Sequence, residues 1–173
     1  MCSKIPGIKI IPQSNLDTIC RHDIIIKLLP LQDIRDNDTK SVSASEVAIL
    51  RKLSSCPFIV TLIEHYEGIN ESCIITEYLA GSDLFNTIAH KSYELSENKC
   101  KVISAQILEA ISFMHGKRII HMDIKPNNIM FASCAKDNLR VKIIDFGLAR
   151  ELGGLGRAKM GGMVGTVRNS TIL

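Results

Sequence analysis

The sequence predicts an α+β fold: a small antiparallel β-sheet with one helix, followed by a mainly helical region that also contains a β-hairpin. Two kinds of apolar pattern predict it. Short runs rich in β-branched residues are typical of strands, whereas apolar residues spaced three and four apart are typical of helices. The expected elements are sheet strands at residues 23–29, 59–66 and 72–78, helices at 43–53 and 96–115, and hairpin strands at 128–131 and 141–144.

Composition and charge are those of an ordinary globular protein. Of 173 residues, 46% are hydrophobic and 23% are charged, which is enough apolar material for a real core. The net charge of +3 is small and evenly spread, so we expect no binding to nucleic acid and no attachment to membranes. No run approaches the roughly 20 apolar residues that cross a bilayer, and the N-terminus lacks the apolar centre of a signal peptide.

The cysteines and histidines form neither a metal-binding nor a disulfide pattern. The six cysteines are scattered, without a C-x-x-C pair, and the five histidines stand apart from one another. Cysteines used in this way are typical of a reducing compartment. We therefore expect a protein of the cytoplasm, the nucleus or both, and we interpret His121 as a structural hydrogen-bonding residue of its loop.

The strand at residues 23–29 contains one charged residue, Lys27. Because an unpaired buried ammonium is costly, Lys27 needs an explanation. One explanation is a pairing with Glu46 on the helix at 43–53, which is what the family resemblance described below implies. The alternative is that Lys27 lies on an edge strand and extends to solvent, while Glu46 forms a capping box with Ser43. Around this strand we expect a short strand at residues 8–11 and loops at 12–17 and 31–40.

A small-residue hinge, residues 79–82, separates the predicted sheet from the helical region. Asp83 follows it and opens a short helix through Ile88, a position where the helix dipole favours an acid. The long helix begins after Ser96, a good N-cap residue, and ends at Gly116, a usual helix stop. Its apolar stripe consists of Ile103, Ile107, Ala110, Ile111 and Met114.

Polar residues that suit phosphate and metal chemistry lie in and after the stretch 119–130. Asp123, Lys125 and Asn128 stand between two apolar runs, and Asp145 follows the second strand of the predicted hairpin. Since the start of one hairpin strand lies beside the end of the other, Asn128 and Asp145 are expected close together. Amide and carboxylate oxygens are ligands that Mg²⁺ accepts, commonly together with phosphates. The alternative is a hydrophobic hairpin flanked by solvated charges.

Two motifs in this order resemble those of eukaryotic protein kinases. The run H-M-D-I-K-P-N-N (121–128) resembles the catalytic loop, and D-F-G (145–147) resembles the metal-binding motif. The resemblance implies a protein-kinase-like bilobal fold, with a small β-sheet lobe in residues 1–79 and an incomplete, mainly helical large lobe in residues 80–173. A lysine two residues after the aspartate is the serine/threonine form. The implied activity is transfer of the ATP γ-phosphate to Ser/Thr hydroxyls of proteins, with ATP and Mg²⁺ bound.

The resemblance also implies roles for individual residues. Asp123 would orient the substrate hydroxyl and accept its proton, and Lys125 would neutralise the moving phosphoryl group. Asn128 and Asp145 would hold Mg²⁺. The implied nucleotide-binding residues are Lys27 and Glu46 at the α/β-phosphates, Thr76, Glu77 and Leu79 around the adenine, and Asp83 at the ribose, unless Asp83 is only the helix N-terminal acid.

Within the kinases, the finer resemblance is to the calmodulin-kinase-like group, near the death-associated-protein and myosin-light-chain kinases. The runs E-Y-L-A-G-S-D-L-F and Q-I-L-E-A-I-S-F-M-H carry it, as does Met122, which stands where most kinases have arginine. Without that arginine no catalytic-loop cation awaits a phosphorylated activation loop, so activity is expected to be independent of such phosphorylation. The group implies a role in intracellular signalling, related to apoptosis or to the cytoskeleton.

Two departures from the kinase pattern concern the two ends of the chain. Only Gly7 lies where a G-x-G-x-x-G loop is expected, so the cover over the phosphates is expected to be degenerate or missing. After Thr166 the chain reads V-R-N-S-T-I-L where the family runs on to A-P-E, so a marginally stable, truncated large lobe is expected.

The alternative function is a catalytically inactive truncated isoform that binds nucleotide or a partner, such as a regulator or the full-length kinase. A P-loop nucleotidase is a poor third hypothesis, because no G-x-x-x-x-G-K-[ST] occurs.

Overall fold

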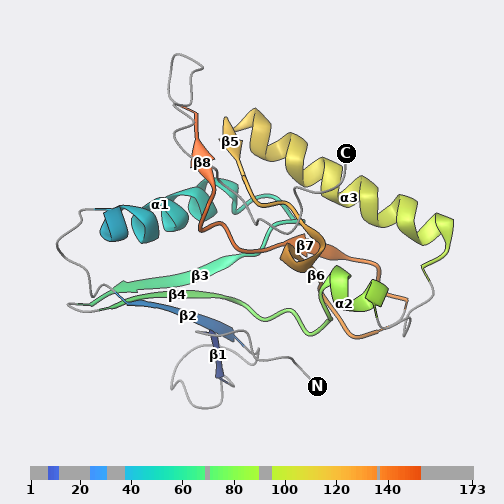
Figure 1. Ribbon diagram of the computed structural model, residues 1–173, viewed down its shortest axis with the longest axis horizontal. Coiled ribbons are helices and arrows are strands. Elements are labelled where there is room, and N and C mark those ends of the chain that lie inside the picture. Colours follow the sequence, from blue (N-terminus) through green and yellow to red (C-terminus); the bar gives the residue numbers. More distant parts are fainter. Residues whose placement is uncertain are drawn as a thin grey trace.

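The structure, a computed structural model, describes residues 8–11, 24–30, 38–68, 71–89, 95–135 and 137–152. An antiparallel sheet carries one helix, and the remaining helices and short strands lie beyond it (Figure 1). The predicted α+β fold is confirmed. Its elements are β1 (Ile8–Ile11), β2 (Ile24–Pro30), α1 (Asp38–Leu53), β3 (Leu62–Glu67), β4 (Glu71–Glu77), α2 (Leu84–Ala89), α3 (Glu97–Gly116), β5 (Ile119–Ile120), the 3-10 helix η2 (Pro126–Asn128), β6 (Ile129–Phe131), β7 (Val141–Ile143) and β8 (Arg150–Glu151).

The four-stranded sheet has the order β1-β2-β4-β3, and each neighbouring pair is antiparallel. β1 confirms the short strand predicted at residues 8–11, and β2 and β4 begin and end within one residue of the predicted strands. Because β2 lies between β1 and β4, Lys27 is on a central strand and the edge-strand alternative is wrong. The loop predicted at 12–17 lies outside the described residues, as do 69 and 70 of the turn between β3 and β4.

β3 begins at Leu62, three residues later than the strand predicted from Ile59. The backbone before it bonds to β7 instead of continuing the sheet. The Ile143 N–H donates to the Phe58 carbonyl at 2.9 Å, and the Val60 N–H donates to the Ile143 carbonyl at 3.0 Å. This partner is distant in the chain, so the local apolar pattern could not distinguish it from a longer strand.

α1 begins at Asp38, whereas the sequence predicted a loop through residue 40 and a helix from Ser43. Ser43 therefore lies inside the helix, where it cannot be the N-cap residue. The capping-box alternative for Glu46 is wrong, and the remainder of the predicted loop, 31–37, lies outside the described residues.

The helical region and the hairpin are close to the predictions. In α3 the Ser96 hydroxyl accepts from the Lys99 N–H at 3.5 Å, as expected of an N-cap residue, and Gly116 is the last helical residue. β6 and β7 form the predicted hairpin, with Ile129 opposite Ile143. The two-residue strands β5 and β8 also pair with each other, and strands this short leave no periodic pattern that could predict them.

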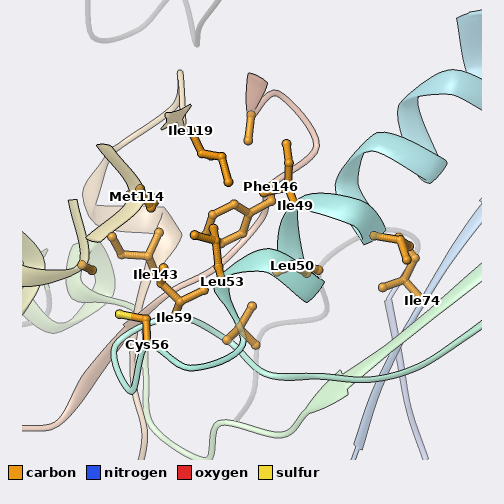
Figure 2. Close-up of a cluster of buried hydrophobic side chains, with 14 residues drawn as sticks. Ile49, Leu50, Leu53, Cys56, Ile59, Ile74, Met114, Ile119, Ile143 and Phe146 are labelled. Atoms are coloured by element: carbon orange, nitrogen blue, oxygen red, sulfur yellow. The ribbon is translucent and has the colours of Figure 1, made fainter. Parts of the chain in front are cut away.

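The larger hydrophobic core joins the sheet, its helix and the hairpin (Figure 2). α1 contributes Leu50 and Leu53, α3 contributes Met114, and Ile143 and Phe146 enter from the end of the hairpin. All five side chains are at most 2% exposed. The residue pair 145–146 is therefore fixed from one side by a packed core.

The predicted hinge, residues 79–82, pairs with β6 through its backbone. The Gly81 N–H donates to the Phe131 carbonyl at 3.1 Å, and the Phe131 N–H donates to the Ser82 carbonyl at 3.0 Å. A Cβ on Gly81 would overlap both the side chain and the backbone of Phe131. Glycine is required here because the two backbones approach so closely.

Candidate active site

Three predicted site residues meet in one ion cluster between the sheet and the hairpin. The Lys27 Nζ of β2 lies 3.0 Å from both carboxylate oxygens of Glu46 on α1 and 3.1 Å from Asp145 Oδ1. The Glu46 side chain is only 4% exposed, while that of Asp145 is 52% exposed. The predicted Lys27–Glu46 pair is therefore present, and it also reaches the carboxylate that follows β7.

The combined effect of burial and neighbouring charges raises the pKa values of Lys27 and Glu46. Burial by itself lowers the pKa of the Lys27 ammonium, but attraction to Glu46 and Asp145 outweighs it, so the pKa is raised. Burial raises the pKa of the Glu46 carboxyl more than Lys27 and a hydrogen bond from the Phe146 backbone lower it. Lys27 therefore stays protonated, and Glu46 depends on Lys27 to remain ionised.

Asp123, Lys125 and Asn128 form a second polar cluster around the 3-10 helix η2. The Lys125 Nζ lies 2.7 Å from Asp123 Oδ2. The Asn128 Nδ2 donates to the Asp123 carbonyl at 2.9 Å and to Asp123 Oδ2 at 3.0 Å. Because the amide nitrogen is committed to Asp123, Asn128 Oδ1 is the atom that remains for a cation. An amide oxygen and the half-exposed Asp145 carboxylate are a donor set that fits Mg²⁺.

Hydrogen bonds made by His121 and Ile144 connect the backbone segments that carry the two clusters. The Ile144 N–H donates to the Asn128 carbonyl at 2.9 Å. His121 Nδ1 accepts from the Asp123 N–H at 3.3 Å, so its Nε2 carries the proton and donates to the Ile144 carbonyl at 3.1 Å. The predicted structural role of His121 is confirmed. Its ring also packs edge-on against Phe146, with centroids 4.7 Å apart.

Two residues beside these clusters adopt a left-handed backbone that non-glycine residues seldom use. The φ angle is 69° at Met122 and 61° at Asp145. Such conformations persist only when surrounding contacts hold them, and they concentrate at functional sites. No signal in the sequence marked them.

The expected adenine-binding residues lie along the end of β4 and the start of the hinge. Thr76 pairs with Ile25 of β2, two residues before Lys27, so Thr76 and Lys27 are on the same face of the sheet. Leu79 is buried, with 2% of its surface exposed. The structure therefore places Thr76 on the face that carries the ion cluster, and Leu79 three residues further on.

The Glu77 side chain makes contacts that the sequence did not predict. Its Oε1 accepts from the Thr61 N–H at 2.6 Å and from Lys142 Nζ at 2.5 Å. Its N–H already donates to the Thr61 carbonyl at 3.1 Å. The N–H of Glu77 is therefore already bonded within the fold. Thr61 lies just before β3, and Lys142 belongs to β7. Only the folded chain brings these two residues to Glu77.

Asp83 acts as the N-cap of α2. Its Oδ1 accepts from the Asn86 N–H at 2.8 Å, and its carbonyl accepts from the Thr87 hydroxyl, also at 2.8 Å. This is the helix-terminal role that was one of its two interpretations. A ribose contact by the same side chain stays a prediction.

The described residues form no cluster of metal-ligating side chains and no membrane-spanning helix. No group of three or more His, Cys, Asp or Glu residues gathers there in a way that could hold a metal ion by itself. Among the described helices, none is long and apolar enough to span a membrane.

The sequence also matches a known protein family over most of its length. The family model described as protein kinase domain matches residues 18–168. The chain belongs to this family.

Individual relatives are kinases of the calmodulin-kinase-like group that the motifs indicated. The chain is 32% identical over 127 residues to a phosphorylase b kinase gamma catalytic chain, liver/testis isoform, of Mus musculus, covering 73% of this chain and 29% of that protein. It is 32% identical over 119 residues to a probable myosin light chain kinase of Dictyostelium discoideum, covering 69% and 24%. It is 37% identical over 129 residues to the probable serine/threonine-protein kinase fhkA of the same organism, covering 73% and 22%.

These relatives are much longer than the matched region. The aligned part covers less than a third of each of the three relatives. The chain is thus homologous to serine/threonine kinases over its kinase region. None of the three names refers to apoptosis, so that part of the expectation has no support.

Proposed function

We propose that this chain is a protein serine/threonine kinase that transfers the γ-phosphoryl group of ATP to Ser or Thr hydroxyls of proteins in intracellular signalling. The observation that carries the proposal is the joint geometry of the two clusters. Lys27, Glu46 and Asp145 meet within 3.1 Å, and one backbone bond ties Ile144 to Asn128 of the second cluster. A hydrophobic hairpin with solvated charges would need neither.

The Lys27 ammonium would bind the α- and β-phosphates of ATP. Glu46 holds it from α1, with both carboxylate oxygens at 3.0 Å, so the ammonium is oriented before nucleotide arrives. Preorganised charge of this kind costs no rearrangement during the reaction. Thr76, Leu79 and the Glu77 carbonyl would contact the adenine, and Asp83 would reach the ribose while capping α2.

Asp123 would receive the proton of the substrate hydroxyl. The hydroxyl oxygen forms a bond to the γ-phosphorus as the bond from that phosphorus to the β-γ bridging oxygen breaks, and ADP leaves. Lys125, 2.7 Å from the Asp123 carboxylate, would neutralise charge on the transferred group. Asn128 Nδ2 donates to the same oxygen, Asp123 Oδ2, at 3.0 Å, so the carboxylate is oriented by two donors.

Asn128 and Asp145 are the residues that would hold Mg²⁺. Bound there, the ion would supply charge neutralisation at the β- and γ-phosphates. In the same proposal residues 1–79 form the small lobe and 80–173 the part of the large lobe that carries the catalytic loop. The hinge at 79–82, fastened to β6 at Gly81, would join them behind the nucleotide.

The proposal is tested by Mg-ATP-dependent labelling of a basic protein substrate. We expect the chain to label the substrate and Asp123→Asn to lose labelling by at least a hundredfold, in keeping with the usual contribution of an acid–base group. Equal background labelling by both proteins would rule out catalysis. A thermal shift by Mg-ATP in that case would favour the alternative, a catalytically inactive nucleotide- or partner-binding form.

Met122 gives a separate test of regulation. Because the catalytic loop has methionine where an arginine would await a phosphate, a negative charge in the activation segment would find no catalytic-loop arginine to pair with. We expect Thr166→Asp to leave the labelling rate within about twofold of the parent. A many-fold increase would contradict the proposed independence from activation-loop phosphorylation.

A further inference from the structure

The hairpin strand that leads to Asp145 has two edges, and each must find hydrogen-bond partners. One edge of β7 pairs with β6, as shown by the Ala132 N–H donating to the Arg140 carbonyl at 2.9 Å. Residues 139, 141 and 143 alternate with 140 and 142, so their N–H and C=O groups point to the other edge. At Ile143 both groups are satisfied by the segment 58–60. Leu139 and Val141 need a different partner.

Gln106, in the middle of α3, is that partner. Its Nε2 donates to the Leu139 carbonyl at 2.9 Å, and its Oε1 accepts from the Val141 N–H at 3.1 Å. A side-chain amide offers one donor and one acceptor at the spacing of a peptide group, so it can substitute for a neighbouring strand. The Nε2 also donates to the Val102 carbonyl of its own helix at 3.2 Å, which restrains the amide.

We infer that Gln106 is a positioning residue for the metal-binding end of the hairpin, an inference that rests on the proposed function. Its two bonds fix where β7 begins along α3. β7 ends at Ile143. The next residue, Ile144, donates its N–H to the Asn128 carbonyl, and the residue after it is Asp145. A shift of β7 along α3 would therefore move the Asp145 carboxylate relative to Asn128, which is bonded directly to Asp123.

The rival explanation is that Gln106 only satisfies buried backbone groups. Two substitutions separate the explanations. Gln106→Met keeps the shape but removes both bonds. Gln106→Glu keeps the acceptor for the Val141 N–H, but its ionised carboxylate cannot donate to the Leu139 carbonyl; protonation restores that donor. The defect of Gln106→Glu should therefore shrink as pH falls, whereas that of Gln106→Met should not.

The experiment measures ATP affinity of the full chain with Mg²⁺ and with EDTA, for the parent, both variants and Glu109→Met, an exposed control on the same helix. We expect the gain in affinity due to Mg²⁺ to fall roughly tenfold in Gln106→Met, the equivalent of one lost hydrogen bond, and to be unchanged in Glu109→Met. In Gln106→Glu the gain should recover, relative to the parent at the same pH, as pH falls towards the range in which the glutamate carboxyl, whose ordinary pKa of about 4.3 is raised by burial, takes up a proton.

The outcomes are distinguishable. If the parent binds Mg-ATP and Gln106→Met keeps the full Mg²⁺ gain while only its melting temperature drops, Gln106 is structural and the inference is overturned. A Gln106→Glu defect that does not change with pH overturns it as well, even if Gln106→Met fails to fold. If the parent itself gains no ATP affinity from Mg²⁺, the proposed function fails first and the positioning role fails with it.

Discussion

At the scale of single residues, the Lys27 ammonium forms ion pairs with two carboxylates of the site. It bonds a buried carboxylate, Glu46, and a half-exposed one, Asp145. A buried pair of this kind contributes little net stability compared with apolar residues, but removing one partner leaves a buried charge without compensation. The effect of mutating Lys27 should therefore be larger than the effect of mutating any surface ion pair.

We predict that Lys27→Met lowers the free energy of unfolding by about 3 kcal/mol near neutral pH. Because burial already raises the pKa of the Glu46 carboxyl, the loss should shrink as pH falls and Glu46 becomes neutral. Urea unfolding at several pH values measures both effects. The control is Lys101→Met, whose ion pair with Glu97 is exposed and should contribute less than about 0.5 kcal/mol. Equal costs for the two variants would contradict the prediction.

A second prediction at this scale concerns His121. Burial lowers the pKa of its imidazole from the ordinary value of 6.5. As pH falls below about 6.5 the unfolded chain takes up a proton that the folded chain does not, so the free energy of unfolding decreases. The contribution of neutral His121 is complete above that pH. It is lost as pH falls towards the folded-state pKa.

Unfolding measured between about pH 8 and about pH 5 tests this. We expect a positive slope of stability against pH that becomes flatter in His121→Gln, whose amide does not titrate. His115→Gln, at an exposed position of α3, should retain the slope of the parent. An unchanged slope in His121→Gln would show that other groups are responsible.

At the scale of elements, backbone hydrogen bonds join the hinge to β6. Gly81 lies so close to Phe131 that a Cβ would overlap backbone atoms. Backbone cannot move aside as a flexible side chain can, so Gly81→Ala should separate the hinge from β6. We predict a loss of about 1–3 kcal/mol in the free energy of unfolding.

Gly116 is the matched control, because nothing lies within 4 Å of a Cβ added there and the residue is helical. Gly116→Ala should be neutral or stabilise the fold by about 0.4–1 kcal/mol. Urea unfolding of the two variants measures the difference. If Gly81→Ala is as stable as Gly116→Ala, the close approach of the hinge to β6 is not required.

At the scale of the whole molecule, one core connects the sheet helix to the hairpin. Phe146 is 1% exposed and packs among residues from α1, α3, β5 and β7 (Figure 2). It also contacts His121. The side chain beside Asp145 is therefore part of the packing that holds the two regions together.

We predict that Phe146→Ala lowers the free energy of unfolding by about 3–5 kcal/mol, and that α1 and the hairpin lose protection from hydrogen exchange together. Phe85→Ala, at a residue that is 51% exposed on α2, is the control and should have little effect. Loss of protection confined to the hairpin would show that the two regions do not share one core.

The sequence by itself determined the elements whose signals are local. The α3 helix has its N-cap at Ser96 and its end at Gly116, and the β6–β7 hairpin has an apolar run on each side of a polar turn. It also determined the family, because H-M-D-I-K-P-N-N and D-F-G carry the chemistry in consecutive residues. The pairing of Lys27 with Glu46 was one of two interpretations, and the family resemblance favoured it.

Only the tertiary structure decided contacts between segments that are far apart in the chain. Glu46 had two interpretations until the start of α1 at Asp38 removed one of them. The bond from Lys142 to Glu77 spans 65 residues and that from Val141 to Gln106 spans 35. No local pattern predicts such bonds, because the need for a partner arises only when folding buries a backbone edge or a charge beside it.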